Sequence, residues 1–166
     1  MKRTFVGALV IALVIGVFAV PATVSAHPHG GYDNVKIGTA GDNTMIGTDG
    51  KDRMKGKGGE DRIHGGKGRD LVVGGSGADD LTGGNLHDEV RGGKGNDKVT
   101  GGNGNDHLYG GNGRDRLYGG PGNDVLHAAG DNYGDLVDCG GGTKDRAIVD
   151  ARDMVTGCES VRVVGQ

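Results

Sequence analysis

Acidic side chains recur at a fixed spacing of nine residues through the middle of the chain, each in the same local setting. Glycine-rich backbone leaves carbonyl oxygens free to point at a ligand, and carboxylates beside them complete an all-oxygen ligand set. Such a set suits Ca²⁺ better than Mg²⁺, because Ca²⁺ accepts more ligands in a more flexible geometry. The candidate metal ligands are Asp52, Asp61, Asp70, Asp79, Asp88, Asp97, Asp106, Asp115 and Asp124.

These aspartates occupy the sixth position of ten consecutive nonapeptides, which run without insertion over residues 38–127. The first position is glycine in all ten repeats, the fourth is glycine except at Leu86, and the sixth is aspartate except at Asn43. The eighth position is always aliphatic, so the last three residues predict a short strand with one side chain inward and two outward. One repeat buries a single aliphatic group and cannot fold alone. The repeats must therefore stack around a narrow shared core.

Stacking brings the aspartates of neighbouring units together. At one β-spacing, about 5 Å, two carboxylates repel each other by about 3 kcal/mol at an effective dielectric constant of about 20. Lysine and arginine do not recur at a fixed position in the repeats, so side chains do not supply the neutralising charge. We therefore expect bound calcium to be part of the fold.

Six repeats, GGKGRDLVV, GGSGADDLT, GGKGNDKVT, GGNGNDHLY, GGNGRDRLY and GGPGNDVLH, resemble the GGxGxDxUx consensus of the RTX, or haemolysin-type, calcium-binding repeat. The resemblance extends over about 90 residues in ten in-phase copies. It implies an all-β fold, a right-handed parallel β-roll (β-solenoid) with two nonapeptides per coil. In such a roll, Ca²⁺ lies between the glycine-rich turns of repeats 18 residues apart, and ten repeats make five coils.

The same resemblance divides the sixth positions between two edges of the roll. One edge presents Asn43, Asp61, Asp79, Asp97 and Asp115, and the other presents Asp52, Asp70, Asp88, Asp106 and Asp124. Four gaps on each edge allow at most eight ions. The sites are not expected to be equal, because Asn43 lacks a charge and a branched side chain at Leu86 can resist the turn geometry. The early repeats also match less well, having Thr39, Thr48 and Lys57 at the second position, and the best matches lie within residues 92–124.

Coils of 18 residues also predict neighbours on the outer surface. Arg62, Asp80 and Lys98 would form a row of alternating charge, which stabilises the sheet only weakly if exposed. The alternative is a solvated face whose charges are arranged at random. Tyr109 and His127 would be outward neighbours in the same way, either as exposed aromatics or as a contact for a sugar or another partner.

Both ends of the chain depart from the repeat. Residues 1–26 begin with Lys2 and Arg3, continue with an uninterrupted apolar run over residues 5–20, and end in small residues. This pattern predicts a secretion signal peptide, with an uncleaved anchor as the alternative. Residues 27–37 form an N-terminal cap segment, in which the alternation of Val35 and Ile37 predicts a strand.

Residues 128–166 are expected to form an irregular terminal coil and cap. Cys139 and Cys158 are the only cysteines, and an exported chain can keep them oxidised, so we expect a disulfide between them. Closing this loop would contribute about 3 kcal/mol and would protect the last open strand edge. Four acidic residues of this segment either hold a further ion or belong to loops: Asp131, Asp135, Asp138 and Asp145.

Other chemistries find no support in the sequence. It contains no HExxH helix, GxSxG elbow, phosphate-binding P-loop or EF-hand loop. Residues 27–166 carry 17 basic and 22 acidic side chains, a formal charge of −5, which argues against a nucleic-acid partner. We expect a secreted calcium-binding protein that folds with extracellular Ca²⁺, is not an enzyme and has no membrane span once mature. The alternative is a calcium-dependent surface adhesion or ligand-binding module with an unknown cell-surface or glycan partner.

Overall fold

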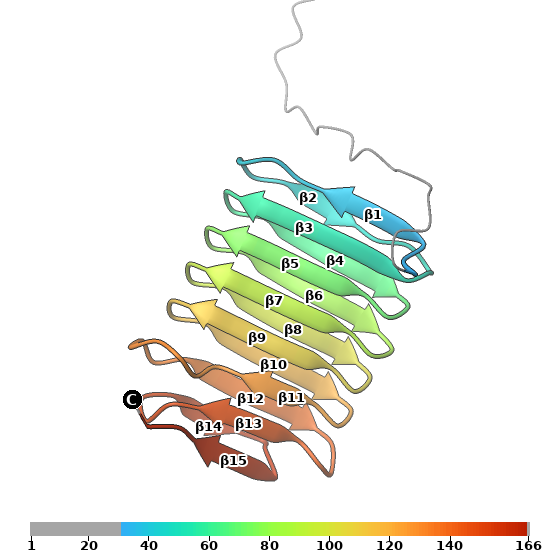
Figure 1. Ribbon diagram of the computed structural model, residues 1–166. Helices are drawn as coiled ribbons and strands as arrows, with labels where there is room; N and C mark the ends of the chain where they lie inside the picture. The colour runs from blue at the N-terminus through green and yellow to red at the C-terminus, as the bar shows by residue number, and fades with distance from the viewer. Residues whose placement is uncertain (1–30, 166) are drawn as a thin grey trace, which may run out of the picture.

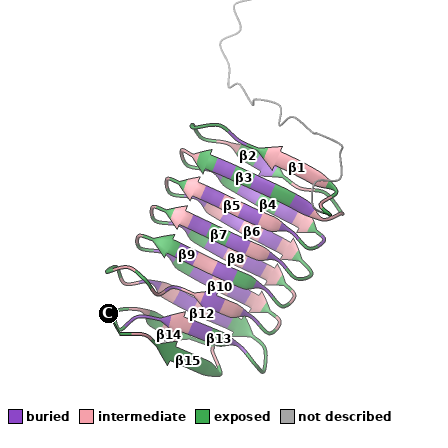
Figure 2. Cartoon of the chain, in the orientation of Figure 1, coloured by how far each residue is buried: buried purple, intermediate pink, exposed green. Residues whose placement is uncertain are grey.

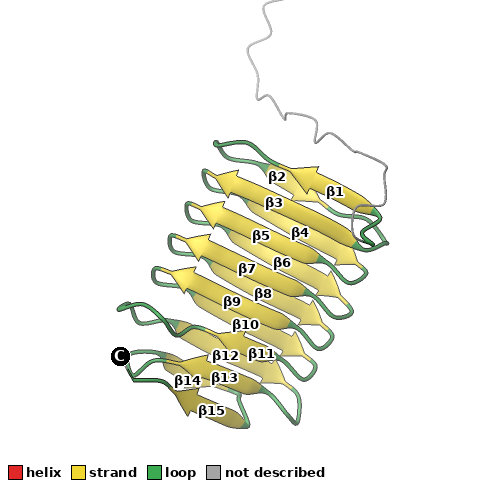
Figure 3. Cartoon of the chain, in the orientation of Figure 1, coloured by secondary structure: helices red, strands yellow, loops and turns green. Residues whose placement is uncertain are grey.

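The computed structural model describes residues 31–165, and these form fifteen strands and no helix (Figure 3). The strands build two sheets. The eight-stranded sheet contains, in spatial order, β1 (Asn34–Ile37), β3 (Asp52–Gly58), β5 (Leu71–Ser76), β7 (Glu89–Lys94), β9 (His107–Asn112), β11 (Val125–His127), β13 (Arg146–Val149) and β15 (Ser160–Val163). The seven-stranded sheet contains β2 (Thr44–Ile46), β4 (Arg62–Lys67), β6 (Asp80–Asn85), β8 (Lys98–Asn103), β10 (Arg116–Pro121), β12 (Leu136–Gly141) and β14 (Met154–Thr156).

The chain winds alternately through the two sheets, so the molecule is a parallel β-solenoid of about seven turns (Figure 1). All strand pairs are parallel, and within the repeats each residue lies beside the residue 18 positions later. Leu81 of β6, for example, pairs with Val99 of β8. The predicted parallel β-roll with two nonapeptides per coil is therefore confirmed.

The core is a single aliphatic file between the two sheets. All ten eighth-position residues are at most 5 % exposed. The buried parts of the strands are purple in Figure 2. The cap extends this file with Val137, Ala147 and Val149. Each nonapeptide thus buries one aliphatic residue, as x-aliphatic-x predicts, and the outward residues on either side of it remain accessible.

The outer rows follow the predicted register. Asp80 lies between Arg62 and Lys98, with ion-pair distances of 3.7 and 3.4 Å, so the row of alternating charge is confirmed. All three side chains are substantially exposed, and each pair is therefore worth at most about 1 kcal/mol. On the other sheet, the rings of Tyr109 and His127 stack with centroids 4.7 Å apart.

The two ends of the roll are closed differently. At the first coil, the inward position of β1 holds Lys36, whose ammonium group donates a hydrogen bond to the Ile46 carbonyl oxygen. At the other end, the predicted Cys139–Cys158 disulfide is present, and β15 and β14 are the edge strands of the two sheets. The expected signal peptide, residues 1–26, lies outside the described residues. The part of the chain that is described holds no helix long and apolar enough to cross a membrane.

Candidate cation sites at the edges of the roll

The sixth-position aspartates lie at the turns between the sheets, and all nine are at most 3 % exposed. All of them except Asp52 use Oδ1 to accept a hydrogen bond from the backbone N–H of the sixth residue one coil earlier. Asp88 N donates to Asp106 Oδ1, and Asp106 N donates to Asp124 Oδ1, both at 2.8 Å. We name the two resulting columns the first ladder, Asp52, Asp70, Asp88, Asp106 and Asp124, and the second ladder, Asp61, Asp79, Asp97 and Asp115.

The other carboxylate oxygen has no such partner. Oδ2 is buried without a hydrogen bond in Asp61, Asp70, Asp79, Asp88, Asp97, Asp106, Asp115 and Asp124. A buried polar atom in this state costs free energy, and a recurring column of them calls for an explanation. Asp52 differs, because its Oδ2 accepts hydrogen bonds from Thr48 N and Thr48 Oγ1 at 2.5 and 3.0 Å. The threonine at the second position therefore satisfies this oxygen with neutral donors, whereas Asp52 Oδ1 is buried without a partner.

Oδ2 of the ladder aspartates lies close to the first-position glycine of the same repeat. A Cβ added at Gly101 would lie 2.5 Å from Asp106 Oδ2 and 2.6 Å from the Gly119 carbonyl oxygen. At Gly83 the corresponding distances are 2.6 Å to Asp88 Oδ2 and 2.8 Å to the Gly101 carbonyl oxygen. A carboxylate oxygen from one coil and a carbonyl oxygen from the next thus lie close together beside the glycine. We call this place beside a first-position glycine a cradle. Two hard oxygen donors with unused lone pairs fit a calcium ion.

Side chains alone do not complete such a site. Within residues 31–165, no three histidine, cysteine, aspartate or glutamate side chains gather around one point. A cation at these turns must therefore take most of its ligands from backbone carbonyls. Ca²⁺ accepts carbonyl oxygens readily, whereas structural zinc sites use cysteine and histidine side chains.

Burial and repulsion between neighbouring carboxylates raise the pKa values of the ladder aspartates. Burial raises the pKa of Asp88 to about 8, the hydrogen bond from Asp70 N lowers it, and the charges of Asp106 and Asp70 raise it again. Burial likewise raises the pKa of Asp97 to about 7. The pKa rises to about 6, again mainly through burial, in Asp70, Asp79, Asp106, Asp115 and Asp124. The metal-free ladder carboxyls therefore hold protons more tightly than ordinary aspartates, and Asp88 and Asp97 are the ones that remain substantially protonated at neutral pH. A bound cation would favour their ionised form.

Both ladders continue into the cap, which the nine-residue period does not predict. Asp115 N donates to Asp135 Oδ1 and Asp124 N donates to Asp145 Oδ1, at 2.8 and 2.7 Å. Two further acceptors, Asp153 Oδ1 and Glu159 Oε2, follow on the second and first ladder. Of the four acidic residues singled out from the sequence, two join the ladders. Asp138 and Asp131 instead accept hydrogen bonds from Gly140 N and Gly113 N.

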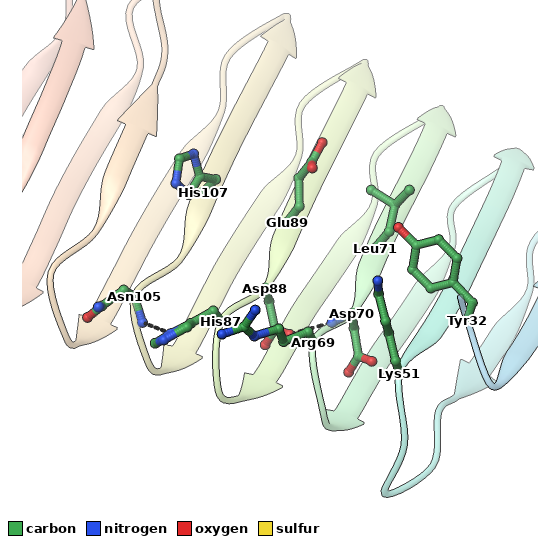
Figure 4. Close-up of a pocket in the computed structure, with 10 residues that line it drawn as sticks. All are labelled: Tyr32, Lys51, Arg69, Asp70, Leu71, His87, Asp88, Glu89, Asn105 and His107. Carbon is green, nitrogen blue, oxygen red and sulfur yellow. Dashed lines mark hydrogen bonds between the residues drawn. The ribbon is translucent and has the colours of Figure 1, made fainter. Parts of the chain in front are cut away.

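A shallow groove of about 490 Å³ runs beside the first ladder (Figure 4). The groove is lined by both basic and acidic side chains. Lys51, Arg69 and His87, at the fifth repeat position, lie next to the ladder carboxylates and Glu89. His87 Nδ1 accepts a hydrogen bond from Asn105 N at 2.8 Å, so this imidazole helps to tie adjacent turns together. The groove therefore exposes charged groups around the turns, and its chemistry is that of the repeats themselves.

A comparison with protein families agrees with this geometry. The family model described as RTX calcium-binding nonapeptide repeat matches six overlapping segments, which together span residues 30–133. This span contains all ten nonapeptides and both ladders as far as Asp124. Among curated proteins, none matches the chain.

Proposed function

Because the chain belongs to the RTX calcium-binding nonapeptide repeat family, we propose that it is a secreted calcium-binding protein whose folding is coupled to extracellular Ca²⁺. In this proposal the protein has no catalytic activity of its own. The observation that carries it is the column of buried, unpartnered Oδ2 atoms, which in all of these residues except Asp115 lie close to a backbone carbonyl oxygen beside a first-position glycine.

The ligands in this proposal come from successive coils of one edge. Along the first ladder, Asp70, Asp88 and Asp106 each contribute Oδ2, and the first-position glycine of the following coil contributes its carbonyl oxygen. Along the second ladder, Asp61, Asp79 and Asp97 do the same. Bound Ca²⁺ would supply the positive charge that lets these buried carboxylates remain ionised. Asn43 and Asp52 are already hydrogen bonded to Thr39 and Thr48, so the first coil is the weakest candidate.

Coupling to folding follows from the balance of forces in the roll. Each nonapeptide buries one aliphatic side chain, so the core is too thin to offset strong repulsion at both edges. Adjacent ionised carboxylates repel each other by about 3 kcal/mol at the spacing of neighbouring strands. Binding to the folded state alone stabilises it by mass action, so the roll forms where calcium is abundant. Secretion rests on the signal-like residues 1–26 and on a disulfide, which persists in oxidising compartments.

Calorimetric calcium titration together with circular dichroism of the full chain tests this function. We expect a disordered spectrum in chelator at neutral pH, sheet formation in millimolar calcium with several ions bound, and no effect of magnesium. The combined substitutions Asp97→Ala, Asp106→Ala and Asp115→Ala should markedly reduce calcium uptake. A matched control removes three acidic groups outside the ladders, by Asp49→Ala, Asp80→Ala and Glu89→Ala, and should bind like the wild type. A chain that is fully ordered without metal and takes up no ion contradicts the proposal.

A calcium-dependent adhesion or ligand-binding module is the second candidate. The observation in its favour is a short outward row on the eight-stranded sheet, where Arg91 lies 5.1 Å from the ring centroid of Tyr109, which stacks on His127. A cation beside two stacked rings offers a surface to a glycan or a protein. Glycan-array binding in calcium and in chelator separates the two functions, and Tyr109→Ala should abolish binding if this row is the contact.

A further inference from the structure

The last complete repeat meets the cap at an unusual residue. Gly119 is the first residue of the repeat that contains Asp124, and in the repeats the residue one coil later is again a first-position glycine. Here the register of β10 and β12 pairs Tyr118 with Asp138 and Gly120 with Gly140. Cys139 therefore stands where the next first-position glycine would be.

The carbonyl group of Cys139 keeps the geometry of the glycine that it replaces. For a Cβ added at Gly119, the Cys139 carbonyl oxygen is the nearest atom, and Asp124 Oδ2 follows at 2.5 Å. This is the arrangement of the Gly101 cradle, with Asp106 Oδ2 at 2.5 Å and the Gly119 carbonyl oxygen at 2.6 Å. Asp124 Oδ2 is buried and has no hydrogen-bond partner.

The second ladder provides an internal comparison. At Gly110 the three nearest atoms to an added Cβ all belong to Asp115, at 2.5 to 3.2 Å, and no carbonyl oxygen is among them. The register of β9 and β11 aligns Tyr109 with His127, so Ala128 stands beside Gly110. The irregular chain after His127 thus brings no carbonyl oxygen within 3.2 Å of the added Cβ at Gly110, whereas the segment that carries Cys139 brings one closer than that at Gly119.

We propose that Asp124 Oδ2 and the Cys139 carbonyl oxygen form a calcium site between the last repeat and the cap, held by the Cys139–Cys158 disulfide. Calcium binding at this site and the redox state of the disulfide are then coupled. This inference rests on the calcium binding proposed above, and it adds a site that lies outside the gaps between consecutive nonapeptides.

The disulfide is placed to hold this carbonyl. The paired residues of β12 and β14 end at Asp138 and Thr156, immediately before Cys139. The bond to Cys158 continues the connection to the outermost coil, and the Cys139 side chain is fully buried. Reduction by dithiothreitol breaks the Sγ–Sγ bond, delivers two electrons and two protons, and leaves two thiols and the oxidised cyclic reductant. The peptide of Cys139 then loses this restraint on the side of the outermost coil.

Thermodynamic linkage makes the effect reciprocal. If reduction weakens calcium binding at this site, bound calcium must oppose reduction by the same factor at equilibrium. The first test measures dithiothreitol reduction of the full chain in saturating calcium. At equilibrium with a dithiothreitol redox buffer, we expect the equilibrium constant for reduction to be roughly 5- to 150-fold larger in Asp124→Asn than in the wild type, the usual range of such coupling. Asp70→Asn makes the same change three coils away on the same ladder and should have the wild-type equilibrium constant for reduction.

The second test counts ions. Cys158→Ser removes the disulfide but leaves Cys139 and its carbonyl in the chain. At a calcium concentration that saturates the repeats, we expect this variant to bind one ion fewer than the wild type, with the sheet signal retained in circular dichroism. If the Cys158→Ser variant does not fold, the reduction of Asp124→Asn compared with that of Asp70→Asn still tests the coupling, because both of these variants keep the disulfide.

The outcomes separate this inference from the proposed function. Equal equilibrium constants for the reduction of Asp124→Asn and Asp70→Asn in calcium overturn the coupling, and so does an unchanged ion count in a folded Cys158→Ser variant. In either case calcium uptake by the wild type leaves the proposed function standing. A wild-type chain that takes up no calcium at all overturns both.

Discussion

Protons should replace calcium as the neutralising agent of this roll. In chelator, we expect the full chain to gain sheet structure when the pH falls from 8 to 5. The ordinary pKa of aspartate is 3.8, whereas burial raises the pKa to about 8 in Asp88 and to about 7 in Asp97 and Asp135. Between the unfolded and folded pKa values the folded state binds more protons, so acidification stabilises it. This stability is complete below about pH 4 and is lost as the pH rises through about 6 to 8.

The size of the effect follows from the number of groups. Eight carboxyls have pKa values raised to between about 6 and about 8: Asp70, Asp79, Asp88, Asp97, Asp106, Asp115, Asp124 and Asp135. At pH 5 a carboxyl of pKa 6 is about 90 % protonated, and one at the unfolded value about 6 %. Folding of the metal-free chain at this pH should therefore take up about seven protons.

Circular dichroism between pH 5 and 8, with potentiometric measurement of proton uptake, tests this expectation. The matched variant Asp88→Asn, Asp97→Asn, Asp106→Asn keeps each Oδ1 acceptor but carries no charge at these sites. In chelator at pH 8 it should be more ordered than the wild type, although it should bind fewer calcium ions. In calcium the pH dependence reverses, because protons compete for the ligand oxygens. If the chelated wild type is equally disordered, or equally ordered, at pH 5 and 8, the reasoning from the ladders is wrong.

Three further substitutions test separate parts of the structure. Gly101→Ala places a Cβ 2.5 Å from Asp106 Oδ2 and should lower the number of bound ions in calorimetry, whereas Gly58→Ala, whose nearest atom lies at 3.5 Å, should not. Leu86→Gly relieves a branched residue at φ 75°, so denaturant unfolding in calcium should show a gain of about 1 kcal/mol. Leu81→Ala empties a fully buried core position and should cost about 2 to 5 kcal/mol in the same assay.

The regular part of the roll was predictable because each position of the repeat has the same structural role in every copy. The aliphatic eighth position predicted the inward file, and Leu81 and Val99 are both fully buried. The period by itself does not say whether a strand pairs with the unit 9 or 18 residues later. The coil of two repeats came from the resemblance to the RTX family, and the paired Leu81 and Val99 confirm it.

The cap was less predictable because it continues the hydrogen-bonded ladders of the repeats, but the number of residues between successive ladder positions changes. Asp135 and Asp145 follow Asp115 and Asp124 by 20 and 21 residues, and Glu159 follows Asp145 by 14. Loops of different length reach the same ladder positions, so a search for a fixed period cannot find them. A usable signal was present nevertheless: Asp135 precedes Leu136 and Val137, and an inward valine two residues after the acid repeats the pattern of the nonapeptides.

Leu86 helps to separate two reasons for glycine in the repeats: a positive φ angle, and the lack of room for a side chain beside the ladder. The sequence suggested that a branched residue would resist the turn there, but Leu86 adopts φ 75° and keeps its side chain 57 % exposed, and Lys57 is accommodated at φ 88°. The ten first-position glycines, by contrast, have no positive φ. Their backbone would accept any residue, so their recurrence reflects the space beside the ladder carboxylates. A Cβ at Gly101, for example, would lie 2.5 Å from Asp106 Oδ2 and 2.6 Å from the Gly119 carbonyl oxygen, so glycine recurs here because these oxygens approach the backbone too closely for any side chain.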